Sequence, residues 1–174
     1  MFDSVTFYYI EEIKSSEVDR YVSLSIPIKP HLKAYLRDFY ELPYVLNQKD
    51  DLGLFLYHLL RRRKFRDRKY FTTDACTDQV EILVSHKYGF NHGCVLMHAY
   101  QVHLFNNYLE DQMMNHAITW IRAAEEAGMN NKAAIYKWIE AYQLDAGSVD
   151  WYHRLKQHYF RFRKARKSGA PCVP

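Results

Sequence analysis

Residues 20–40 read RYVSLSIPIKPHLKAYLRDFY, and this short segment joins two kinds of secondary structure. Through residues 21–28 large apolar side chains alternate with small or amphipathic ones, which is the period of a half-buried strand. Pro27 and Pro30 end that strand because proline cannot donate a ladder hydrogen bond, and the fixed φ of Pro30 suits the first turn of a helix. Apolar residues at helical spacing continue as far as Phe39. The segment therefore predicts a strand that leads directly into a helix.

Two further segments have the composition of strands. Residues 4–13 (SVTFYYIEEI) are rich in β-branched and aromatic side chains, and we expect them to pair with residues 20–29 as a hairpin. Residues 77–85 (TDQVEILVS) are expected to form a third strand. The first half of the chain therefore predicts a small antiparallel sheet.

Between these strands the sequence predicts one more helix. Residues 52–59 repeat apolar side chains at i, i+3, i+4 and i+7, and Asn47 or Asp50 is available to cap the helix that they form. Residues 41–50 are expected to be a loop, and residues 86–94 (HKYGFNHGC) a turn.

The second half of the chain is expected to be helical. One long helix covers residues 98–127 and ends at Gly128, because glycine adopts a left-handed conformation without strain. Residues 130–144 predict another helix, and the last helix follows the turn DAGS with Ser148 as its N-cap. The apolar stripes of the three helices are Val102, Phe105, Leu109, Met113, Ala117, Trp120, Ile121 and Ala124; Ile135, Trp138, Ile139 and Tyr142; and Tyr152, Leu155, Tyr159 and Phe162.

The expected fold class is therefore α+β, with a small antiparallel sheet in the first half and a helical second half. We expect one continuous globular unit with a strand-containing part at 1–96, a helical part at 97–167 and a tail at 168–174. The last two helices also invite comparison with a helix-turn-helix. The buried frame of that motif would be occupied here by Trp138, Tyr142, Leu144, Val149 and Tyr152.

Charge is distributed unevenly along the chain. The net charge is +4, but residues 61–69 carry +6, residues 151–174 carry +7 with no acidic residue, and the remainder carries −9. An ordinary solvated surface mixes both signs. Segregation of this size favours a polyanionic partner.

The closing helix is the main candidate for contact with that partner. Its apolar stripe needs a surface to pack against, so its arginines would project from a docked helix and not from a loose tail. Guanidinium groups held in this way suit phosphate binding. The first turn of the second helix of a helix-turn-helix reads bases, which makes Trp151 and His153 candidate base contacts. The candidate phosphate contacts are Arg154, Lys156, Arg161, Arg163, Lys164, Arg61, Arg62, Arg63 and Arg66.

The segment IPIKPHLKAYLRDFYELPYVLNQKDDLGLFLYHLLRR (26–62), the segment FNNYLED (105–111) and the basic aromatic C-terminus together resemble small proteins encoded in the genomes and mobile elements of gut Bacteroidales. No motif with an assigned chemistry accompanies the resemblance, so it supplies no functional residue. It implies a setting in DNA transactions, such as a transposon, plasmid or phage.

Several other kinds of protein are disfavoured. The chain has no run of apolar residues long enough to span a bilayer and no signal-peptide pattern, so no membrane partner is expected. Its three widely spaced cysteines do not suggest a disulfide framework, and free thiols predict a reducing, cytoplasmic setting.

No cofactor, metal or catalytic centre is expected. Zinc ligands usually come in pairs two to five residues apart, and His86, His92, Cys94 and His98 form no good pair. The chain also lacks a phosphate-cradling glycine-rich loop and a serine nucleophile elbow.

The sequence therefore predicts a non-enzymatic, nucleic-acid-binding protein whose first target is duplex DNA. An alternative is a structural or interaction protein that forms homo-oligomers by pairing its basic and acidic surfaces. A third interpretation is binding of RNA or single-stranded DNA, because aromatic side chains are interleaved with the cations.

Overall fold

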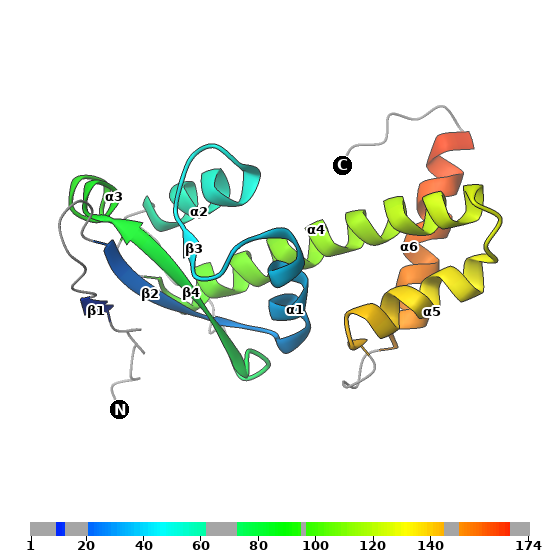
Figure 1. Cartoon of the computed structure of the whole chain (residues 1–174), viewed down its shortest axis with the longest axis horizontal. Helices are drawn as coiled ribbons and strands as arrows, with labels where there is room; N and C mark the ends of the chain where they lie inside the picture. The colour runs from blue at the N-terminus through cyan, green and yellow to red at the C-terminus, as the bar shows by residue number, and fades with distance from the viewer. Residues whose placement is uncertain (1–9, 13–20, 62–72, 95–96, 145–149, 168–174) are drawn as a thin grey trace. The chain divides into compact units, whose positions relative to one another are not determined.

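The computed structural model describes residues 10–12, 21–61, 73–94, 97–144 and 150–167. The chain divides into two compact units, Met1–Tyr108 (unit 1) and Leu109–Pro174 (unit 2). Its described elements, drawn in Figure 1, are β1 (Ile10–Glu12), β2 (Tyr21–Ile28), α1 (Pro30–Phe39), β3 (Tyr44–Val45), α2 (Asp51–Arg61), β4 (Asp78–Ser85), α3 (His86–His92), α4 (Ala99–Glu126), α5 (Asn131–Ala141) and α6 (Trp151–Lys167).

The α+β fold class is confirmed by the sheet of unit 1. The strand order is β1-β2-β4-β3, and the β1–β2 and β2–β4 pairs are antiparallel, as the hairpin and the third strand require. Of the predicted strand at 4–13, only β1 lies among the described residues. The sheet also contains β3, which pairs in parallel with β4. Strand β3 lies within residues 41–50, which were expected to form a loop. The sheet is therefore mixed and not purely antiparallel.

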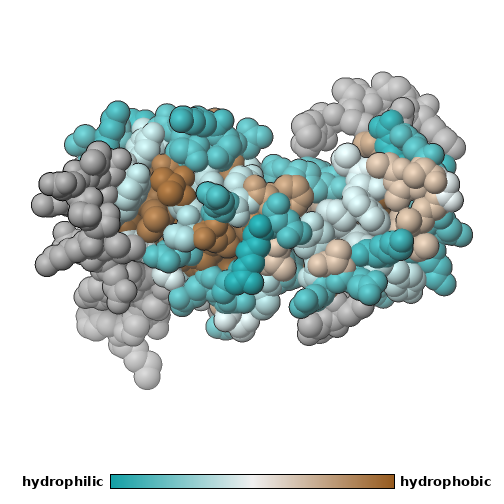
Figure 2. Space-filling view, in the orientation of Figure 1, coloured by the Kyte–Doolittle hydropathy of each residue, from teal (hydrophilic) through white to brown (hydrophobic). Residues whose placement is uncertain are grey.

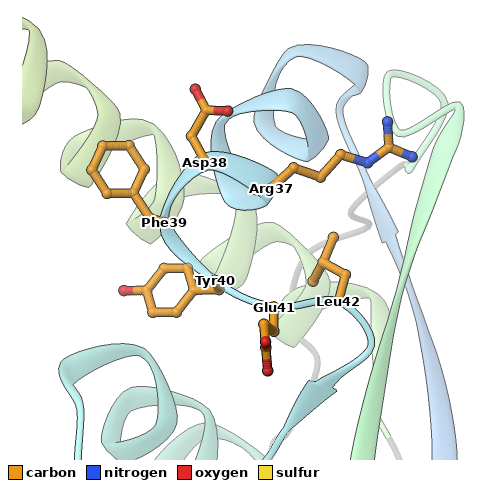
Figure 3. A pocket seen from close by; sticks show the side chains of 6 residues that line it. All are labelled: Arg37, Asp38, Phe39, Tyr40, Glu41 and Leu42. Atoms are coloured by element: carbon orange, nitrogen blue, oxygen red, sulfur yellow. The ribbon is translucent and has the colours of Figure 1, made fainter.

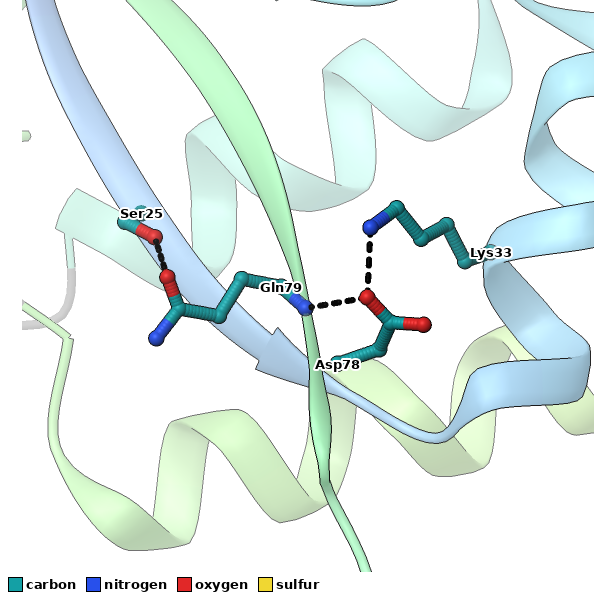
Figure 4. Close-up of polar contacts among 4 residues, drawn as sticks. All are labelled: Ser25, Lys33, Asp78 and Gln79. Atoms are coloured by element: carbon teal, nitrogen blue, oxygen red, sulfur yellow. Dashed lines mark hydrogen bonds and ion pairs between the residues drawn. The ribbon is translucent and has the colours of Figure 1, made fainter.

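Polar side chains fix the register of β2 on β4 and attach α1 to the sheet (Figure 4). Ser25 donates a hydrogen bond to the Gln79 side chain at 2.7 Å across the two strands. Lys33, on α1, forms an ion pair with Asp78 at the start of β4. The hydrogen bond from Lys33 lowers the pKa of the Asp78 carboxyl below its usual value.

The buried side of β2 follows the predicted alternation only in part. Its larger apolar residues, Val22, Leu24, Ile26 and Ile28, are all buried as expected. Ser23 is buried as well, and its hydroxyl donates to Glu81 at 2.6 Å. Helices α1 and α3 both pack against the sheet, so less of β2 faces solvent than a half-buried strand would allow.

The start of α2 is held by a compact cap. Asp50 accepts hydrogen bonds from the backbone N–H of Gly53 at 2.7 Å and from the Tyr44 hydroxyl at 2.6 Å, which confirms one of the two predicted caps. Asn47 also donates to Asp50, at 3.0 Å. A Cβ at Gly53 would overlap the Asn47 carbonyl oxygen, so this turn requires a glycine. Strand β3 and helix α2 are joined by this cap.

Residues 86–92 form helix α3, so the predicted turn at 86–94 is wrong over most of its length. Only the end of this segment is a turn. There Gly93 adopts a left-handed φ of 68°, and its N–H donates to the Gly89 carbonyl at 2.9 Å. Glycine and asparagine within this segment suggested a turn, but α3 packs on β2 and β4, and tertiary contacts can outweigh weak local propensity.

Helix α4 contributes its first turns to unit 1, so the boundary between the two units falls within α4. Two buried side-chain amides attach the start of α4 to unit 1. Asn106 donates to the Pro27 carbonyl at 3.1 Å and accepts from the Lys29 N–H at 3.0 Å, and Gln101 donates to the Leu59 carbonyl. These amides satisfy backbone groups at the ends of β2 and α2 that would otherwise be buried without partners.

Unit 1 exposes three large apolar side chains among its described residues, namely Phe39, Val45 and Leu54. The darkest brown in Figure 2 lies over the region in which Figure 1 draws β3 and α2. Phe39 was expected to continue the buried stripe of α1, but 46% of it is exposed because α1 ends there.

Unit 2 consists of the remainder of α4 with α5 and α6. The helix predicted at 98–127 is confirmed as Ala99–Glu126, and Gly128 ends it with a φ of 87°. The N–H of Gly128 donates to Glu125 at 2.9 Å and that of Met129 to Ala124 at 2.9 Å, which is a Schellman motif. Helix α5 then begins with Asn130 as its N-cap.

The core of unit 2 contains most of the predicted apolar stripes. The α5 residues Ile135, Trp138 and Ile139 are buried, as is Tyr142 directly after that helix. Two members of the α4 stripe are less buried than predicted. Ala124 is half-buried, and 37% of Trp120 is exposed, with its ring 5.9 Å from the ring of Trp138.

Helix α6 is docked, as the apolar pattern predicted, but with a shifted buried stripe. Leu155 and Tyr159 are buried together with Trp151, whereas Tyr152 is only half-buried. Residues 151, 155 and 159 are separated by four positions and therefore lie on one helix face. The N-cap is Asp150, which accepts from the His153 N–H at 3.0 Å; the predicted cap, Ser148, lies outside the described residues.

Candidate nucleic-acid interface

Two hydrogen bonds tie α6 to α4 within unit 2. Arg154 donates to the Glu110 carboxylate at 3.0 Å, and the side chain of Glu110 is only 11% exposed. The Tyr159 hydroxyl donates to Glu125. Burial, followed by this hydrogen bond, raises the pKa of the Tyr159 phenol to about 12. Both contacts hold α6 against α4. Neither could be predicted from the spacing of residues along α6.

Arg154 therefore has an internal role. Besides its pairing with Glu110, its guanidinium lies 4.9 Å from the centroid of the Trp151 ring, a cation–π contact. Because the charge of Arg154 is balanced by a nearly buried carboxylate, Arg154 is less available to a phosphate than the other cations of α6, and its role as a phosphate contact stays a prediction.

The two predicted base contacts, Trp151 and His153, lie in different surroundings, and the prediction that they contact bases is untested. Trp151 is 4% exposed and belongs to the core, since it begins the buried stripe of α6. His153 is exposed, but its Nδ1 lies 2.5 Å from Asp150, and the carboxylate also caps the helix. Hydrogen bonds from His153 hold the pKa of Asp150 below its usual value. The first turn of α6 thus presents a capping carboxylate where base-reading groups were expected.

The helix-turn-helix frame is met in its first part. Trp138, Tyr142 and Leu144 are buried as the frame requires, whereas Tyr152 is only half-buried. Val149 and the turn at 145–149 lie outside the described residues. The crossing of the two helices in the manner of that motif stays a prediction.

Four further cations of α6, Lys156, Arg161, Arg163 and Lys164, are exposed or half-exposed, and we call this group the outer surface of α6. Within the described chain, no carboxylate lies in ion-pair distance of Lys156, Arg161 or Arg163. Arg161 and Arg163 are exposed, and Lys156 is half-exposed beside Tyr152, with its Nζ 5.7 Å from the ring centroid.

A histidine between these arginines is kept neutral. Burial, with Arg161 and Arg154 close by, lowers the pKa of His158 below its ordinary value, which Asp111 only partly offsets. The imidazole is therefore uncharged at pH 7, and the positive charge of the outer surface comes from lysine and arginine alone.

Little of the first basic block is among the described residues. Arg61 ends α2 and is exposed, and its guanidinium contacts Tyr57 through a 3.4 Å hydrogen bond and a cation–π contact at 5.8 Å. The candidate contacts Arg62, Arg63 and Arg66 lie outside the described residues. Their role stays a prediction.

A pocket of about 470 Å³ lies beside the end of α1, and it offers no alternative phosphate site. Its six lining residues, 37–42, are consecutive, and Figure 3 shows their side chains leaving one turn in different directions. The lining carries two carboxylates and one guanidinium. Burial, with Asp50 and Asp51 nearby, raises the pKa of Tyr40, so its phenol stays protonated at neutral pH.

The histidines and cysteine considered as metal ligands do not gather. Among the residues that the structure describes, no three His, Cys, Asp or Glu side chains could hold a metal ion together. His92 instead lies edge-on to the ring of Tyr57 and tilted against that of Tyr88. Cys94 is fully buried, and this burial raises the pKa of its thiol. No helix in the described ranges is long and apolar enough to cross a membrane.

Comparison of the chain with protein-family models, curated proteins and solved structures found no match. The resemblance to proteins of gut Bacteroidales and the mobile-element setting therefore stay predictions.

The structure also brings together residues that the sequence did not single out as contacts for a ligand. Tyr136 on α5 stacks on Tyr152 of α6, with ring centroids 5.0 Å apart and ring planes 15° apart. Lys132 lies one turn before Tyr136, with its Nζ 6.0 Å from the ring centroid. The lysine–tyrosine spacing of four residues is visible in the sequence, but the pairing of the two tyrosines depends on how the helices pack.

Proposed function

We propose that this protein binds nucleic acid, in the first instance duplex DNA, through phosphate contacts made by the outer surface of α6. The observation that carries the proposal is the absence of ion-pair partners for Lys156, Arg161 and Arg163 in the described chain, on a helix whose other face is packed. Docked arginines lose less side-chain entropy on contact than arginines of a mobile tail.

The expected mode of binding is largely independent of DNA sequence. Phosphate contacts fix position and supply affinity, whereas sequence is read by groups at base edges. The first turn of α6, where such groups were expected, holds a buried Trp151 and a capping Asp150. The cations instead concentrate toward the C-terminal half of the helix, which favours backbone contact over base reading.

A direct test is a titration of a fluorescent blunt duplex at low salt with the wild-type protein and with the triple variant Arg161→Gln, Arg163→Gln, Lys164→Gln. All three residues are exposed, so the variant should fold normally. Its affinity should fall at least about a hundredfold, because three charge-assisted contacts are lost. Equal binding by both proteins, or no binding by the wild type, would reject the proposal.

Self-association through opposite charges is the competing account, and the same samples test it. Size-exclusion chromatography without DNA should give a salt-independent mass for the wild type if the outer surface of α6 serves nucleic acid. Self-association would be favoured if the apparent mass of the wild type decreases as the salt concentration rises and that of the triple variant does not.

A further inference from the structure

The stacked tyrosines extend into a longer pattern on α6. Tyr152, Lys156 and Phe160 follow each other at steps of four residues, and Arg163 and Lys164 come three and four residues later. Residues at these steps lie on one side of a helix. An aromatic ring and a cation therefore alternate along this side of α6, and Tyr136 with Lys132 of α5 widens the pattern at its first aromatic.

Two of the aromatic rings in this pattern, Tyr136 and Phe160, are open to solvent, whereas Tyr152 is half-buried against Tyr136. Phe160 is 55% exposed and Tyr136 is 49% exposed, the two highest values among the large hydrophobic side chains that the structure exposes. A single exposed aromatic is ordinary, but here the rings are aligned and interleaved with lysines. The Nζ atoms of Lys132 and Lys156 lie 6.0 and 5.7 Å from the ring centroids, near the outer limit of a cation–π contact. Either ammonium group could therefore leave its ring for a phosphate at small cost.

We propose that this stripe, formed by Tyr136, Tyr152, Lys156, Phe160 and Arg163, binds an unpaired nucleic-acid strand by stacking its bases on the rings and pairing its phosphates with the cations. The proposal rests on the proposed function and adds a site for unpaired bases beside the phosphate contacts to duplex DNA. Base faces are exposed in a single strand, whereas in a duplex they are covered by neighbouring base pairs. Aromatic rings therefore add affinity to that of the phosphate contacts only where bases are unpaired, as at a duplex end, gap or junction.

The spacing of the stripe suits several nucleotides. At 1.5 Å per residue, Tyr152 and Phe160 are separated by about 12 Å along α6, which corresponds to about three or four nucleotides at the 3.4 Å rise of a stacked strand. Lys156 lies midway between the two rings, where the backbone of such a strand would pass.

The test compares three labelled probes of equal length at one low salt concentration: oligothymidine, an abasic strand with the same phosphates, and a blunt duplex. The variant Tyr136→Leu, Phe160→Leu removes two exposed rings and leaves the cations in place. Trp120→Leu is the matched control, because Trp120 is an exposed aromatic of the same unit that contacts Trp138 and not the stripe.

The wild type should bind oligothymidine at least about fivefold more tightly than the abasic strand, which is the lower end of what stacking contributes per base. The double variant should lose that preference and keep its affinity for the duplex within about twofold, since phosphate contacts are unchanged. Trp120→Leu should behave as the wild type does.

Failure of the two proposals is distinguishable. Equal wild-type affinity for the oligothymidine and abasic strands, or an equal loss for all probes in the double variant, would overturn the stacking site and leave phosphate binding standing. No wild-type binding to any probe would overturn the proposed function and the stacking site with it.

Discussion

Arg154 and Arg161 differ by seven positions on one helix, and the structure predicts opposite consequences when each is changed to alanine. Arg154 donates a charged hydrogen bond to Glu110 and lies over Trp151. Loss of a hydrogen bond to a charged group costs about 1.5–3 kcal/mol, and loss of the cation–π contact about 0.5–1 kcal/mol. Because 37% of the Arg154 side chain is exposed, water recovers part of this, and we expect Arg154→Ala to lower the free energy of unfolding by about 2 kcal/mol.

Arg161→Ala is the matched control. Arg161 is exposed on the same helix and forms no ion pair within the described chain, so its removal should change the free energy of unfolding by less than about 0.5 kcal/mol. Its effect should appear in DNA binding instead, where one lost phosphate contact flattens the log–log salt dependence by about 0.9.

The assay is urea unfolding followed by tryptophan fluorescence. All three tryptophans lie in unit 2, so the signal reports the unit that contains α6. Arg154→Ala should lower the urea midpoint at an unchanged slope, which indicates a change in stability and not in the surface exposed on unfolding. If Arg154→Ala keeps wild-type stability, or if both variants lose equal stability, the division of roles along α6 is wrong.

Three other predictions concern stability. Leu155→Ala should cost about 2–5 kcal/mol in the same fluorescence assay, because Leu155 is fully buried; a cost below about 1 kcal/mol would mean that α6 is not docked. Gly53→Ala should destabilise unit 1 by about 1–3 kcal/mol in a circular-dichroism melt, since the added Cβ would overlap the carbonyl of Asn47, and a neutral result would refute the close approach. Stability should also fall as pH rises from 10 to about 12: the buried Tyr159 phenol has a pKa raised from 10.0 to about 12, so the folded state holds its proton where the unfolded state releases it. In the tryptophan-fluorescence assay, which reports unit 2, the Tyr159 phenol should account for about 2–3 kcal/mol of this loss, so Tyr159→Phe should lose that much less than the wild type.

Local patterns predicted those elements whose signals lie within a few residues of each other. Pro30 begins α1, Asp50 caps α2 and Gly128 ends α4, and each acts through the backbone of its own turn. The strands β2 and β4 and the docking of α6 followed from hydrophobic periodicity in the same way.

Features that depend on distant partners could not be predicted. Strand β3 has two residues and exists because β4, more than thirty positions later, offers it an edge. The period of α6 allowed either Trp151 or Tyr152 to point inward, and only packing against α4 and α5 decides for Trp151. The internal role of Arg154 depends on Glu110, which is 44 positions away in the sequence, so the local pattern could not distinguish Arg154 from the other cations of the basic helix.

The most direct measurement of the central claim is the salt dependence of duplex binding by the wild type and by the triple variant Arg161→Gln, Arg163→Gln, Lys164→Gln. Four contacts from the outer surface of α6 predict a slope of about −3.6 in a plot of log affinity against log salt concentration, since each neutralised phosphate contributes about 0.9. The triple variant retains Lys156 and should give a slope near −1, with unfolding unchanged. A wild-type slope shallower than about −2, or a triple variant with the wild-type slope, would contradict the claim that these cations bind phosphate.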